Sequence, residues 1–92
     1  MVFTYPAVFR KEADSTYTGY MPDLKGISFK ADSFDTAVRE AHHEMEQYLI
    51  AEFEEEDPNL PPVSEPDDIE LSDGEQVVQI SVHYRFHQGF DE

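Results

Sequence analysis

The chain has 92 residues, and its 21 acidic side chains outnumber its 6 basic ones, which gives a formal net charge of −15 at pH 7. This length suits one domain. The charge argues against binding to nucleic acid or to an anionic membrane, because both need lysine and arginine. It favours a basic protein partner. A merely solubilising surface with disordered acidic stretches is the alternative explanation.

Cysteine is absent, which excludes disulfides and thiolate metal sites. The first residues contain no basic region followed by a long apolar run, so no signal peptide is predicted. No apolar stretch approaches the roughly 20 residues of a membrane-spanning helix. We therefore expect a cytoplasmic protein.

The first third of the sequence predicts three strands in an antiparallel meander. Residues 2–9, 16–21 and 27–31 are rich in β-branched and aromatic side chains or alternate apolar with polar ones. Polar residues 11–15 form the first turn. The second turn, at residues 22–26, combines a proline that presets φ with a glycine that allows positive φ.

Three residues in these strands carry specific expectations. Tyr17 and Tyr20 are three positions apart and should therefore point to opposite faces of the sheet. Pro6 conflicts with a strand interior, because proline belongs at a strand start, an edge or a bulge.

A helix is predicted to follow Ser33, which can act as its N-cap. Asp32 and Asp35 lie near the positive end of the helix dipole. Apolar residues then recur at the i, i+3, i+4 spacing of one buried stripe: Phe34, Ala37, Val38, Ala41, Met45, Tyr48, Leu49 and Phe53. The helix should lie across the meander.

Residues 54–76 differ from the rest, because they combine an acidic block at 54–57 with four prolines. So long a connection suggests a functional or partly mobile segment. Residues 77–82 predict a fourth strand, with Val78, Ile80 and Val82 on one face. Since a helical crossover precedes it, this strand is free to pair in parallel with an earlier one. The predicted fold is thus α+β, with the order β-β-β-α-β over residues 1–92 and a short aromatic tail at 83–92.

Several features in the same order resemble the N-terminal domain of HicB-like antitoxins. They are the run Tyr5-Pro6-Ala7-Val8-Phe9, then Tyr17 and Pro22-Asp23-Leu24 with Gly26, then Ala31-Asp32-Ser33, Ala37 with Ala41, Tyr48-Leu49, Pro61-Pro62 and a valine-rich closing strand. The resemblance extends to about Val82. It implies a partial ribonuclease H-like fold and a role in a toxin–antitoxin system.

In that family the partner, HicA, is a small basic ribonuclease that cleaves messenger RNA, and the antitoxin silences it by covering its active surface. Many members continue into a ribbon-helix-helix or helix-turn-helix domain. These 92 residues contain no such region, so the resemblance carries no expectation of operator binding. The alternative function is an orphan regulatory or interaction module of the same fold with a different protein partner.

We expect no enzymatic activity, no cofactor and no metal site. Ribonuclease H-like nucleases cluster carboxylates around two metal ions, and the first predicted strand contains no carboxylate. His42 and Glu46 are four residues apart and could form a two-ligand clip, and His83 and His87 could align on a strand. The zinc-protease pattern needs a second histidine where Glu46 stands.

The candidate contact residues fall into two groups. Acidic or aromatic side chains expected to face the partner are Glu12, Asp14, Tyr17, Tyr20 and Asp23. Placed opposite a basic ribonuclease, Glu12 and Asp14, together with the block at 54–57, would mimic RNA phosphates. Tyr84, Phe86 and Phe90 lie beyond the predicted core and suggest self-association into a homo-oligomer. Ordinary solvated charge and aromatic cover of the sheet are the alternatives.

Overall fold

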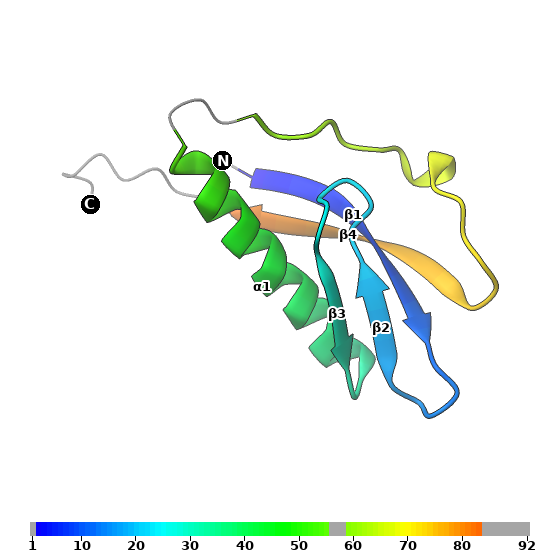
Figure 1. Ribbon diagram of the computed structural model, residues 1–92. Helices are drawn as coiled ribbons and strands as arrows, with labels where there is room; N and C mark the ends of the chain where they lie inside the picture. Colours follow the sequence, from blue (N-terminus) through cyan, green and yellow to red (C-terminus); the bar gives the residue numbers. More distant parts are fainter. Residues whose placement is uncertain (1, 56–58, 84–92) are drawn as a thin grey trace.

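The computed structural model describes residues 2–55 and 59–83. Four antiparallel strands form one sheet in the order β3-β2-β1-β4, and a single helix packs on one of its faces (Figure 1). The elements are β1 (Val2–Lys11), β2 (Tyr17–Tyr20), β3 (Ser28–Ala31), α1 (Phe34–Phe53), a 3-10 turn η1 (Pro66–Asp68) and β4 (Glu75–His83). The predicted α+β class, the meander and the helix on the sheet are confirmed.

Strand β1 is central and accommodates Pro6 because its two edges are paired over different lengths. Strand β4 pairs with β1 from Val2 to Arg10, whereas β2 pairs only from Val8 onward. The backbone N–H of Glu12 bonds the carbonyl of Thr16 at 2.8 Å, so even-numbered residues of β1 point their backbone groups toward β2. The nitrogen of Pro6 therefore faces the stretch of that edge with no strand partner, and the sheet loses no hydrogen bond.

The prediction that the fourth strand could pair in parallel is wrong, because β4 runs antiparallel to β1. Helix α1 returns the chain to the start of β1, where the rings of Phe3 and Phe53 lie 5.4 Å apart. A strand beginning there would run parallel to β1. Instead, residues 59–74 travel the length of the sheet a second time, and β4 begins with Glu75 opposite Arg10 (Figure 1).

The core lies between α1 and the face of the sheet that carries the odd-numbered side chains of β1. The predicted stripe is confirmed: Ala37, Ala41, Met45 and Leu49 are fully buried, and the other four stripe residues pack against them. Ser33 caps the helix as predicted, with its hydroxyl oxygen accepting the N–H of Thr36.

Gly19 on β2 is fixed by close packing. A Cβ at this position would collide with the ring of Phe29 and lie 2.6 Å from the carbonyl oxygen of Val8. The ring of Phe29 in turn lies 5.3 Å from that of Phe9. The absence of a side chain at Gly19 thus lets the core aromatic rings lie directly on the backbone of β2.

Candidate interaction surfaces

The two strand tyrosines point to opposite faces of the sheet, as predicted. Tyr17 packs against Phe34 in the core, with ring centroids 5.6 Å apart. Tyr20 lies on the face away from α1, which we call the open face, and 39% of its surface is exposed. Of the two, Tyr20 is therefore the more accessible to a partner, since Tyr17 is partly buried.

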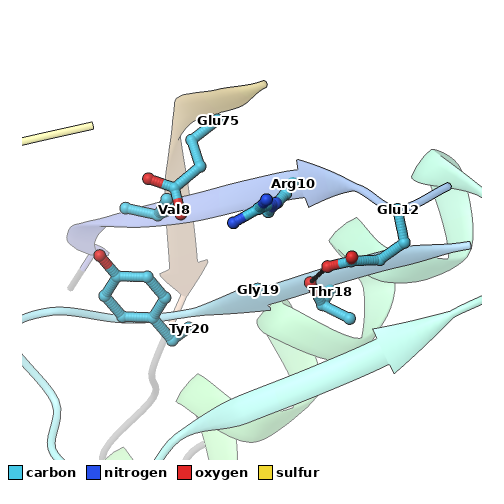
Figure 2. Close-up of a pocket in the computed structure, with 7 residues that line it drawn as sticks. All are labelled: Val8, Arg10, Glu12, Thr18, Gly19, Tyr20 and Glu75. Atoms are coloured by element: carbon cyan, nitrogen blue, oxygen red, sulfur yellow. Dashed lines mark hydrogen bonds between the residues drawn. The ribbon is translucent and has the colours of Figure 1, made fainter. Parts of the chain in front are cut away.

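The open face contains a shallow hollow of about 220 Å³. Its lining combines both charges with hydroxyls and one aliphatic side chain: Val8, Arg10, Glu12, Thr18, Gly19, Tyr20 and Glu75 (Figure 2). Arg10 lies opposite Glu75 in the β1–β4 register. The hydroxyl of Thr18 donates to the carboxylate of Glu12 at 2.6 Å. This mixture of charges suits a polar protein surface better than a free anion.

Asp14 is used within the β1–β2 turn. Its carboxylate accepts the hydroxyl of Thr16 at 2.6 Å and the backbone N–H of the same residue at 3.1 Å. These hydrogen bonds lower the pKa of Asp14 below its ordinary value. Ser15 beside it has a φ of 74°, the left-handed residue that commonly follows the tight turn of a three-residue hairpin loop.

Asp23, in the β2–β3 turn, holds the long connection against the sheet. Its two carboxylate oxygens accept the N–H of Ser64 at 2.8 Å and the hydroxyl of Ser64 at 2.6 Å. Nearby, the part-buried hydroxyl of Tyr5 donates to the carbonyl of Pro61 at 2.6 Å. Burial raises the pKa of Tyr5 above its ordinary value of 10.0, and electrostatic interactions with Asp23 and, to a smaller extent, Tyr48 raise it further. We call the four residues Tyr5, Asp23, Pro61 and Ser64 the clasp.

No three histidine, aspartate or glutamate side chains lie close enough to hold a metal ion within residues 2–55 and 59–83. His42 is exposed on α1, where Glu46 lies one turn further on. No helix in the same ranges has the length and hydropathy to cross a membrane. Tyr84, Phe86, Phe90 and His87 lie outside the described residues, as do positions 56 and 57 of the acidic block.

No protein-family model and no curated protein sequence matches this chain. Among solved structures, it is similar to the N-terminal domain of the Burkholderia pseudomallei antitoxin HicB, with a TM-score of 0.77 and 16% sequence identity. The match covers 89% of this chain and 100% of the HicB domain. The chain has the HicB N-terminal fold. At this identity the comparison establishes the fold alone.

On this HicB-like fold the charge is divided unevenly along the chain. Residues 1–39 contain five acids and five bases, whereas no lysine or arginine occurs between Arg39 and Arg85. That second stretch contains fourteen acids. It forms the rest of α1, the connection and β4 (green to orange in Figure 1). The negative field therefore arises mainly from one part of the HicB-like fold.

Sequence reasoning missed several members of these surfaces. The alternation of β1 could have placed Arg10 beside Glu12 on one face. Ser64 gave no signal, because its partner Asp23 lies 41 residues earlier. Glu75 became visible only once the register of β4 was known.

Proposed function

We propose that this protein is an antitoxin-like binding protein, which neutralises a basic RNA-cleaving toxin of the HicA type by covering its active surface. The protein itself catalyses no reaction in this proposal and acts in the cytoplasm. The single observation that carries the proposal is the fold: the chain matches the HicB N-terminal domain over the whole length of that domain, with a TM-score of 0.77.

The charge distribution supports a cationic partner. The exposed acids Glu65, Asp67, Asp68 and Glu70 follow one another along the connection, with no base among them. The clasp fixes the chain just before them, at Ser64. A negative segment held in place attracts a basic protein and raises its association rate, because its electric field steers the encounter.

The test begins with the product of the gene next to this one, when that gene encodes a small basic protein. The purified pair should form a complex whose association rate falls steeply between about 50 mM and 500 mM salt, because screening weakens attraction between exposed charges. RNA cleavage by the neighbour alone should stop when this protein is added in equal amount. Failure to bind, or undiminished cleavage, would refute the proposal.

Two matched double variants locate the negative surface. Asp67→Asn with Asp68→Asn removes two charges from the first turn of η1. Asp32→Asn with Asp35→Asn removes two charges at the start of α1. The first pair should slow association several-fold and reduce its salt dependence, while the second has a smaller effect. Equal effects of the two pairs would show that only net charge matters.

A further inference from the structure

The outer edge of β4 is the longest strand edge without a partner in the described sheet. Strand β4 is the last strand in the order β3-β2-β1-β4. The odd-numbered residues of β1 direct their backbone N–H and C=O groups toward β4. In the β1–β4 register these residues lie opposite the even-numbered residues of β4, whose backbone groups therefore point toward β1. The backbone N–H and C=O groups of Val77, Gln79, Ser81 and His83 therefore point outward.

Within the described chain no backbone hydrogen bond from the connection reaches these outward groups. The bond nearest to them joins the N–H of Glu75 to Ser72, at the turn that opens the strand. Charged side chains and prolines usually protect a strand edge from pairing with another chain. From Gln76 to Val82 the strand contains neither. The opposite edge, β3, has only four residues and contains Lys30.

We propose that β4 is a self-association edge, which pairs antiparallel with β4 of a second copy to give one continuous eight-stranded sheet. Gln79 is the middle residue of β4. A two-fold axis at Gln79 sets Gln79 opposite its own copy and Val77 opposite Ser81, so that the outward groups of these residues meet. The two copies exchange identical contacts, and the dimer is closed.

The side chains fit this register. On the α1 face, Val78 of one copy lies opposite Ile80 of the other. Val78 is only partly buried in the single chain, so pairing would cover it further. At each end of the paired strands Glu75 lies opposite His83, a carboxylate facing an imidazole that can donate a hydrogen bond to it. No position of the register sets two like charges opposite each other.

The salt dependence of the dimer is opposite to that of the proposed toxin complex. Two copies that each carry a charge of −15 repel one another, so added salt should strengthen self-association. The inference is independent of the proposed function. If the protein dimerises more strongly at high salt but binds no toxin, only the proposed function is refuted. If it binds a toxin in a salt-sensitive way but stays monomeric, only the proposed dimer is refuted.

The test is sedimentation equilibrium of the full chain at low and at high salt, up to about 1 mM protein. Gln79→Pro is the diagnostic variant, because it removes an outward N–H that β1 does not use and leaves the pairing with β1 intact. The dimer dissociation constant should rise about tenfold or more, through loss of the two hydrogen bonds at the axis. Gln79→Ala is the matched control, which keeps the N–H and should still form the dimer.

A second pair of variants covers the case in which Gln79→Pro does not fold. Gln79→Lys and Gln79→Glu should each be monomeric, because like charges face each other across the axis. Mixing the two should give a heterodimer, detected by native mass spectrometry. A monomeric parent protein at high salt and high concentration would overturn the inference, and so would charge variants that dimerise as well alone as when mixed.

Discussion

Removing the carboxylate of Asp23 should release the connection from the sheet, whereas removing the hydroxyl of Ser64 should only loosen it. Asp23→Ala abolishes both hydrogen bonds and leaves the N–H of Ser64 without its acceptor. Hydrogen bonds to charged groups contribute about 1.5–3 kcal/mol when well buried. Since this pair is only part-buried, we expect a loss of about 2 kcal/mol for Asp23→Ala. Ser64→Ala keeps the N–H bond and should cost about 1 kcal/mol.

Two measurements separate local release from global unfolding. Urea denaturation gives the global free energy, which for a chain of this length is about 5–14 kcal/mol. Hydrogen exchange at the Ser64 amide reports the clasp itself, and it should accelerate in Asp23→Ala even where the urea midpoint moves little. The double variant should show a coupling of at least about 0.5 kcal/mol. Unchanged exchange at Ser64, or strictly additive effects, would refute the clasp.

Two further predictions concern the core. Because the pKa of Tyr5 is raised in the folded protein, its protonated hydroxyl contributes fully to stability below pH 10. This contribution is lost as the pH rises through the raised pKa, because the ionised hydroxyl cannot donate to Pro61. Tyr5→Phe should therefore flatten the fall in thermal stability that is measured above pH 10. Gly19→Ala should lower the free energy of unfolding in urea by about 1–3 kcal/mol, because the methyl group meets the backbone oxygen of Val8. Adding Phe29→Leu should recover only part of this loss. A Gly19→Ala variant as stable as the parent would contradict the packing argument.

Local patterns predicted the elements correctly because each one depends on neighbouring residues. The stripe of α1 and its cap at Ser33 are set within a few turns of helix, and both are confirmed. The turn at residues 22–26 likewise depends on one glycine, Gly26, whose φ is 90°. The alternation that places Tyr17 and Tyr20 on opposite faces is equally local.

Long-range features were not accessible in the same way. The direction of β4 depends on whether the chain after α1 returns along the sheet, and residues 54–74 contain no periodic pattern that would indicate it. Parallel pairing therefore remained open until the register with β1 was known. The clasp has the same origin, since no local rule relates Ser64 to a turn 41 residues earlier. For this reason Asp23 was predicted as a partner contact without its role inside the chain.

The uneven division of charge explains how so acidic a chain can keep a small core. Like charges destabilise a compact state most where they are crowded together. Here β1, β2, β3 and the start of α1 are built from a charge-balanced segment, and the excess acids lie along an elongated molecule whose longest dimension is 49 Å. That length is several times the screening distance of about 8 Å at physiological salt, so distant acids scarcely interact. The remaining repulsion falls on the connection, where the clasp opposes it. Self-repulsion should therefore act first on the clasp, and lowering the salt should accelerate exchange at the Ser64 amide before it affects amides of β1.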